Sequence, residues 1–193
     1  MMRPDLLTTQ LAAATIWSLR STCSRRRVGC ILVNDKAHVL ATGYNGVPTG
    51  HTHCVETPCP GSNLPSGTGL DKCQAIHAEM NALLQCRNAY EIETCICTTA
   101  PCTICIGLLL NTSCKTIYFG EDYPHAEASR KLWEGRKRVW QKVPAQLQWL
   151  SDAIVDAYRG MDGADPGPVA RLTPLEQSIV DRCGHGDKGP NSN

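Results

Sequence analysis

Apolar residues recur along this chain at two different periods, and the changes of period predict alternating helices and strands. Near the amino end, Leu7 and Leu11 stand four residues apart inside the range 4–20, so we predict a helix there. Short apolar runs flanked by polar turn residues follow at 28–33 and 39–43. Runs of this length bounded by turns are typical of strands.

The alternation continues through the middle of the chain. Helices are predicted at 77–87, 102–110, 126–135 and 143–158. Strands are predicted at 93–98 and 115–119, with a further strand after the third of those helices. Because strands alternate with helices, we predict an α/β fold in which helices cover both faces of a sheet.

Two long stretches lack a periodic pattern. The range 44–72 is rich in Gly, Pro, Thr and Ser, and a loop of this length is usually functional, disordered or tied down by another group. From residue 160 the composition shifts to Gly, Pro and Asp, and 173–176 have the pattern of a helix start. We therefore divide the chain into a domain at 1–160 and a C-terminal extension at 161–193, partly disordered with one short helix.

Composition narrows the class of protein. The chain has 193 residues, 42% of them hydrophobic, which is enough for one domain with an apolar core. The formal net charge of +1 argues against a protein that coats nucleic acid. No apolar run approaches the roughly 20 residues that a membrane-spanning helix needs, and 11–17 lacks the cleavage pattern of a signal peptide. We predict a cytoplasmic protein that binds neither nucleic acid nor membrane.

Cysteine is unusually frequent, with 12 residues, and its spacing indicates a metal site. The segments H-A-E at 77–79 and P-C-T-I-C at 101–105 each open a predicted helix. Cysteines three apart lie on one face of a helix, and the amino end of a helix favours thiolate over thiol. An imidazole from His77 with thiolates from Cys102 and Cys105 would leave the fourth position of a tetrahedral zinc ion open, as in catalytic zinc sites.

The arrangement H-x-E…P-C-x-x-C is the signature of zinc-dependent nucleobase deaminases. In such an enzyme zinc lowers the pKa of its bound water, and the resulting hydroxide attacks C4 of cytosine. Glu79 would accept the proton of the water, pass it to ring N3 and deliver a second proton as ammonia leaves. The alternative is a structural zinc site, or a buried histidine beside two unrelated core cysteines.

Two further segments carry a resemblance to a narrower family. Residues 20–29 and 43–48 resemble the R-S-T-C-x-R and G-Y-N-G-x-P stretches of the deoxycytidylate (dCMP) deaminase family, within the cytidine deaminase-like superfamily. The resemblance runs from about Arg20 to Tyr123, roughly half of the chain. It implies a three-layer α/β/α fold with a mixed sheet of about five strands, and usually a homo-oligomer, with a hexamer favoured.

The same resemblance implies deamination of dCMP to dUMP in a pocket for a free nucleotide. It assigns Arg25 to the phosphate and Asn45 to the sugar and base. Ala78 and Tyr123 are assigned to the same pocket. The chemistry of the side chains agrees, because a guanidinium fork suits phosphate and an amide offers both donor and acceptor. The alternative for Arg25 is a solvated charge run at 25–27.

A second, structural zinc is implied because some members of the family carry one in the region of the long loop. The candidate ligands are Cys23, Cys54, Cys59 and Cys73. Four thiolates would close a tetrahedral site and stabilise the loop. His51 and His53 are competing ligands, and free thiols are the alternative. The cysteines in predicted strands and helices are expected to be small core residues: Cys30, Cys86, Cys95, Cys97 and Cys114.

Members of the family are often activated by dCTP and inhibited by dTTP. The resemblance implies a site for these effectors near the loop at 43–50, and Mg²⁺ is expected with dCTP.

A tRNA adenosine or other polynucleotide deaminase could use the same zinc ligands but would need a broad basic surface, which the near-neutral charge disfavours. Other nucleoside or base deaminases, including the deaminase half of a riboflavin-pathway enzyme, stay open, as does a 5-substituted dCMP substrate. A non-catalytic zinc module is disfavoured by Glu79, since a structural site has no use for a carboxylate there.

Overall fold

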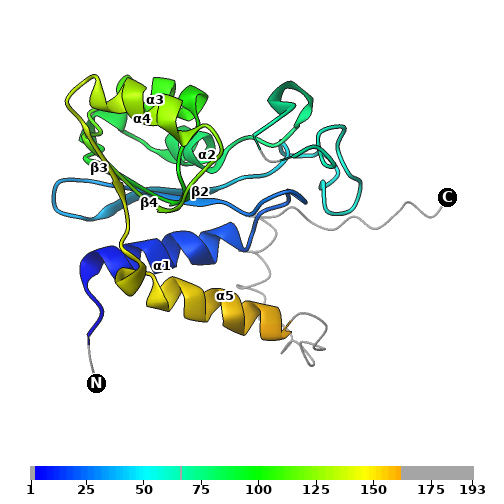
Figure 1. Ribbon diagram of the computed structural model, residues 1–193, viewed down its shortest axis with the longest axis horizontal. Helices are drawn as coiled ribbons and strands as arrows, with labels where there is room; N and C mark the ends of the chain where they lie inside the picture. The colour runs from blue at the N-terminus through cyan, green and yellow to red at the C-terminus, as the bar shows by residue number, and fades with distance from the viewer. Residues whose placement is uncertain (1–2, 66, 162–193) are drawn as a thin grey trace.

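The computed structural model describes residues 3–65 and 67–161, and a five-stranded sheet runs through their centre (Figure 1). The strands are β1 Gly29–Val33, β2 Val39–Tyr44, β3 Thr94–Thr99, β4 Thr116–Glu121 and β5 Val139–Lys142. Across the sheet they follow the order β2-β1-β3-β4-β5. β1 runs antiparallel to β2 and β3, whereas β3, β4 and β5 are parallel. The expected mixed sheet is therefore confirmed.

Helices cover both faces of this sheet. One face carries α2 Ala78–Gln85, α3 Thr103–Leu110 and α4 Ala126–Glu134, and the other carries α1 Leu6–Ser18 and α5 Trp149–Met161 (Figure 1). Short 3-10 helices lie at Leu70–Lys72, Ala89–Glu91 and Ala145–Leu147. Helices α3 and α4 each link two parallel strands, which need a crossover connection of this kind. The predicted three-layer α/β/α fold is confirmed.

Each face of the sheet has its own apolar core. The larger core lies toward α2, α3 and α4 and includes Cys97, Ile117 and the fully buried Trp133. The smaller core lies toward α1 and includes Leu11 and Ile96. Ile96 and Cys97 belong to different cores because successive residues of a strand point to opposite faces.

Helix α1 begins directly after Asp5, whose carboxylate accepts a hydrogen bond from the backbone N–H of Thr8 at 2.9 Å. The helix packs against β1 and β3 on one side and against α5 on the other. For this reason it buries polar residues such as Thr8 and Thr15 as well as Leu11.

Most element bounds differ from the sequence-based ones by one or two residues, but the last helix begins at Trp149 and not at Val143. The backbone N–H of Val143 donates to Phe119 O at 2.8 Å, so this residue continues the sheet pairing, and Pro144 after it is extended with φ −56° and ψ 143°. The helices of the described ranges are all too short or too polar to cross a membrane. The predicted extension at 161–193 lies outside the described residues beyond Met161.

Candidate metal centre and active site

The three predicted metal ligands meet where α2 and α3 begin. His77 directly precedes α2, and Cys102 directly precedes α3, both in extended backbone conformation. The Nδ1 atom of His77 lies 3.3 Å from the Sγ of Cys102 and 3.4 Å from the Sγ of Cys105. All three ligand atoms lie within 4.8 Å of one another, a spacing that allows all three to reach a single ion.

Two close approaches of backbone put α2 at this position. A Cβ atom on Gly43 of β2 would stand 2.2 Å from the carbonyl oxygen of Ala78, so only glycine lets the strand approach the helix so closely. Gly46 and Ile76 form an isolated antiparallel bridge, with N–H to O distances of 3.1 and 2.8 Å. The long loop between β2 and α2 is therefore fastened at its base, beside the metal ligands.

One thiol of the cluster, that of Cys102, has a pKa below that of an ordinary cysteine. The hydrogen bond with Cys105 lowers the pKa of Cys102 to about 4, against the opposing effect of burial. The same hydrogen bond and burial raise the pKa of Cys105. The hydrogen bond with Cys102 raises the pKa of His77. A divalent cation among these atoms would deprotonate the second thiol, because a coordinating thiol loses its proton to the ion's field.

Glu79 lies in the first turn of α2 and is only 4% exposed. Burial is the main reason that its pKa is raised, to about 7, while the positive charge of His77 acts in the opposite direction. Glu79 and His77 line the same cleft. A carboxyl group with this environment is suited to exchange protons with a bound molecule.

The cleft beside the cluster encloses about 610 Å³, part of it open to solvent. All four residues expected to contact substrate line it: Arg25, Asn45, Ala78 and Tyr123. The structure thus brings together residues from the segment before β1, from the end of β2, from α2 and from the segment after β4.

Two of these side chains have partners that the sequence did not reveal. The Nη2 group of Arg25 donates to the carbonyl oxygens of Pro65 and Thr68, the latter at 3.2 Å. The Oδ1 atom of Asn45 accepts from the backbone N–H of Val28, and its Nδ2 donates to the backbone oxygen of Arg26, each at 2.8 Å. Asn45 therefore fixes the backbone of the arginine-rich segment, in addition to facing the cleft.

The four cysteines expected at a second zinc site are not gathered as tightly. The Sγ of Cys54 lies 3.4 Å from the backbone N of Cys59 and 3.2 Å from the Oγ of Ser24. Burial raises the pKa of Cys54, but these hydrogen bonds outweigh it and lower the pKa to about 7. Among the described residues, neither Cys23, Cys54, Cys59 nor Cys73 belongs to a group of three ligand atoms within 4.8 Å.

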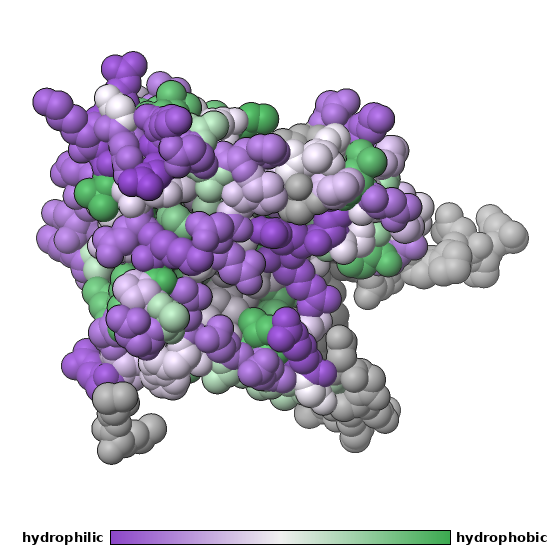
Figure 2. All heavy atoms as spheres, viewed as in Figure 1, coloured by the Kyte–Doolittle hydropathy of each residue, from purple (hydrophilic) through white to green (hydrophobic). Residues whose placement is uncertain are grey.

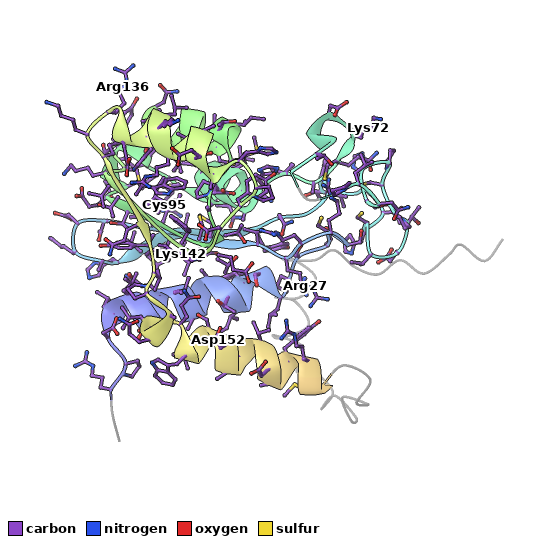
Figure 3. The ribbon with its side chains drawn as sticks, in the orientation of Figure 1. Arg27, Lys72, Cys95, Arg136, Lys142 and Asp152 are labelled. Carbon is purple, nitrogen blue, oxygen red and sulfur yellow. The ribbon has the colours of Figure 1, made fainter. Side chains whose placement is uncertain are left out.

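Another group of three thiols lies deep in the sheet, where Figure 3 shows Cys95 between the strands and the covering helices. The Sγ atom of Cys95 is 3.6 Å from that of Cys30 and 3.5 Å from that of Cys97, and all three residues are fully buried. These cysteines belong to the larger apolar core, as does Cys114. Cys86, also expected in the core, is only partly buried against it.

Sequence reasoning left several residues that line the cleft unassigned, among them Arg26, Thr99 and Ala100. Arg26 lines it, although the sequence could not separate Arg26 from its charged neighbours. Thr99 and Ala100 also line it, since they connect the carboxyl end of β3 to Cys102. Their place directly before the P-C-x-x-C segment was the available signal for them.

Comparisons with known proteins identify a family with a zinc-binding region, in agreement with the cluster of His77, Cys102 and Cys105. The model of the family described as the cytidine and deoxycytidylate deaminase zinc-binding region matches residues 2–121. A deoxycytidylate deaminase of Saccharomyces cerevisiae is 35% identical over 134 residues, which cover 68% of this chain and 43% of the yeast protein. One from Schizosaccharomyces pombe is 38% identical over 125 residues, covering 63% and 38%. The chain thus spans about two fifths of the length of these two relatives.

A shorter relative and a solved structure are matched along their whole length. The deoxycytidylate deaminase of Mycobacterium phage D29 is 35% identical over 128 residues, which cover 63% of this chain and 99% of the phage protein. The crystal structure of the dCMP deaminase from cyanophage S-TIM5 in complex with dCMP and dUMP is similar with a TM-score of 0.58 and 25% identity. That similarity covers 74% of this chain and 100% of the cyanophage chain.

Proposed function

The chain belongs to the cytidine and deoxycytidylate deaminase family, and we propose that it hydrolyses the exocyclic amine of dCMP to give dUMP. The observation that carries this proposal is a cluster of three metal-ligand atoms, from His77, Cys102 and Cys105, at a cleft that His77, Cys102 and the buried Glu79 line. The yeast and phage relatives are deoxycytidylate deaminases, and the similar cyanophage enzyme binds both dCMP and dUMP.

Zinc fits the ligand set of His77, Cys102 and Cys105. The matched family region is a zinc-binding one, and an imidazole with two thiolates is a ligand set that zinc favours. Three protein ligands are also the number found in catalytic zinc sites. When bound there, the zinc ion supplies Lewis acidity that makes water a nucleophile near neutral pH.

The residues of the chain perform the proton transfers and hold the nucleotide. Glu79 takes a proton from the attacking water and places it on N3 of the cytosine ring. It then takes the remaining proton from the new C4 hydroxyl and delivers it to the leaving amine, so that ammonia departs as the C4 carbonyl forms and one carboxyl group serves both halves of the reaction. The burial of Glu79 supports this role, because a carboxyl group shielded from bulk water exchanges its proton with the bound base.

The remaining residues of the cleft are proposed to hold the rest of the nucleotide. Asn45 faces the sugar and base, and Ala78 packs beside the base next to Glu79. Arg25 and Tyr123 bind the 5′-phosphate, which suits a guanidinium fork and a phenolic donor. All four residues line the cleft that contains His77.

The second, structural zinc is proposed to use Cys23, Cys54, Cys59 and Cys73. The first three of these residues are buried, and the lowered pKa of Cys54 favours the thiolate that metal binding needs. Ligation of Cys73 would bring the far end of the long loop to the same ion. The loop would then fold around the metal, as small metal-stabilised segments do.

The assembly and its regulation are proposed from family resemblance. A homo-oligomer, with a hexamer favoured, is supported by exposed apolar residues on α2 and α3, namely Leu84, Ile104 and Leu108. Activation by dCTP with Mg²⁺ and inhibition by dTTP are proposed at the loop at 43–50. A cytoplasmic location is proposed because the cysteines outside the two proposed zinc sites, such as Cys30, Cys95 and Cys97, form no disulfide in the described ranges, as is usual in reducing compartments.

The proposed activity is tested by ammonia release from a panel of substrates offered to the zinc-loaded chain. The panel contains dCMP, 5-methyl-dCMP, 5-hydroxymethyl-dCMP, dCTP, deoxycytidine and adenosine-containing RNA. We expect the highest kcat/KM for dCMP or a 5-substituted dCMP, because the cleft joins the metal ligands to cationic side chains suited to a single phosphate. Turnover of RNA in preference to every nucleotide would identify a polynucleotide deaminase and contradict the proposal.

A further inference from the structure

Arg26 has a hydrogen-bond donor that no group of the described chain uses. Its Nη1 atom is buried and has no hydrogen-bond partner among the described residues. The guanidinium carbon lies 5.9 Å from the centre of the Tyr123 ring. A contact with an aromatic ring provides no hydrogen-bond acceptor for Nη1 within the plane of the guanidinium.

An unpaired buried donor is costly, and the cost is greater for a charged group. Arg26 lines the same cleft as His77 and Glu79, so an acceptor placed in that cleft can reach its guanidinium. An anionic ligand would satisfy the donor, and its charge would be balanced by that of the arginine. The unpaired Nη1 is therefore a donor that an anion in the cleft could use.

The backbone around Arg26 is held in place before any ligand arrives. Asn45 donates to the Arg26 backbone oxygen and accepts from the Val28 N–H, each at 2.8 Å. Shortly after Arg26, β1 begins at Gly29, and its strand is buried throughout. A guanidinium on such a fixed segment loses little conformational freedom when it binds a ligand.

Arg25 and Tyr123 line the cleft together with Arg26. Burial raises the pKa of the Tyr123 hydroxyl, and the charges of Arg25 and Arg26 act against that rise. Both guanidinium groups are therefore close enough to the phenol to influence its ionisation. Part of the Arg25 fork is committed to the carbonyl oxygens of Pro65 and Thr68, whereas the Nη1 of Arg26 has no such partner within the described ranges.

We propose that Arg26 is a second phosphate-binding arginine of this enzyme and a main source of its preference for the nucleotide over the nucleoside. The proposal rests on the proposed deamination of dCMP and deepens it. Arg26 donates from Nη1 to a phosphate oxygen, the Tyr123 hydroxyl donates beside it, and Arg25 also holds Pro65 and Thr68 at the edge of the cleft.

Arg27 offers a matched control, because it belongs to the same charged segment but faces the other way. It is exposed, and its guanidinium carbon lies 5.0 Å from the ring centre of Tyr158 in α5. Figure 3 shows Arg27 on the side of the sheet where α1 and α5 lie. The substitution R27A removes the same charge as R26A without touching the cleft that contains His77.

The test measures kcat/KM for dCMP and for deoxycytidine in the wild type, R26A and R27A. R26A is expected to lower the ratio of the two values by about 10- to 100-fold, the effect of one charge-assisted hydrogen bond. R26K keeps the charge but not the fork and should recover part of the loss. R27A should keep the wild-type ratio. A wild-type ratio in R26A, or equal losses in R26A and R27A, would overturn the role of Arg26.

Binding of inorganic phosphate, followed by calorimetry, separates this proposal from the proposed activity. The affinity should fall in R26A and stay at the wild-type level in R27A. If the wild type does not deaminate dCMP, the proposed function fails. The phosphate affinities then still show whether Arg26 binds phosphate. If dCMP is deaminated but R26A binds phosphate like the wild type, only the role of Arg26 fails. R26Q replaces R26A in both measurements should R26A unfold.

Discussion

At the scale of single residues, His77 and Glu79 reach the same cleft although they are only two positions apart. On a regular helix surface, side chains two residues apart do not face one another. The rule does not apply to His77, because it precedes α2 in an extended conformation with φ −72° and ψ 157°, while Glu79 lies in the first helical turn. The sequence could suggest this arrangement from the motif, but only the extended backbone of His77 explains how it is built.

The chain provides a matched pair of cysteines for testing the metal centre. Cys105 and Cys97 are both fully buried, but only Cys105 lies beside His77. Metal analysis should show that C105A loses one zinc ion per chain and its deaminase activity, because two ligands hold the ion poorly. C97A should keep the zinc content of the wild type.

Equal zinc content in C105A and the wild type would remove Cys105 from the site. The wild-type value also tests the second zinc, since the proposed cysteine site requires one ion beyond that held by His77. A single zinc ion per wild-type chain would leave Cys23, Cys54, Cys59 and Cys73 as free thiols.

At the scale of elements, two glycines explain how helices come so close to the sheet. A Cβ atom on Gly29 of β1 would stand 1.9 Å from the backbone oxygen of Ala14 in α1. One on Gly43 of β2 would stand 2.2 Å from that of Ala78 in α2. Both glycines belong to the segments that resemble the deaminase family. Part of that resemblance therefore reflects packing and not catalysis, which the sequence alone could not separate.

The approach at Gly43 predicts a position-specific effect of alanine. G43A should destabilise the fold by about 1–3 kcal/mol, the usual cost of overpacking, and lower kcat because α2 carries Glu79. G107A is the control, because a Cβ atom at Gly107 in α3 would meet nothing within 4 Å. That substitution should raise stability by about 0.5–1 kcal/mol, since alanine favours a helix over glycine.

Thermal unfolding of the two variants, together with their rates of ammonia release, checks this prediction. If G43A unfolds at the same temperature as the wild type and releases ammonia at the same rate, the close packing of β2 against α2 does not hold Glu79 in place.

At the scale of elements, the apolar pattern predicted most bounds but placed the start of the last helix too early. Regular apolar spacing predicted α3 and β4 to within two residues. It failed at Val143, an apolar residue before a helical pattern, because the hydrogen bond to Phe119 O keeps it in the sheet. The local signal was Pro144, because a proline disfavours the helical conformation of the residue before it.

At the scale of the whole molecule, the matched family region ends at residue 121, but the fold does not. Helices α4 and α5 and strand β5 follow that region and complete the three layers (Figure 1). Trp133 of α4 is fully buried in the larger core, and α5 packs against α1. Residues up to Met161 therefore pack into the same three-layer fold.

The surface of the molecule adds one constraint on its partners. In the view of Figure 2, hydrophilic side chains cover most of the face and apolar ones occur between them as separate spots. With a formal net charge of +1, the chain lacks the strong positive charge that nucleic-acid binding usually requires. Both features favour a small substrate that enters a cleft.

The most direct test of this account compares dCMP deamination by the wild type and by E79Q at equal zinc content. The amide introduced by E79Q would keep the shape of the buried side chain but could not accept the proton of the attacking water. We expect E79Q to bind zinc as the wild type does and to release ammonia about 10²- to 10⁴-fold more slowly, the usual contribution of a general acid–base group. Ammonia release by E79Q at the wild-type rate would contradict the account.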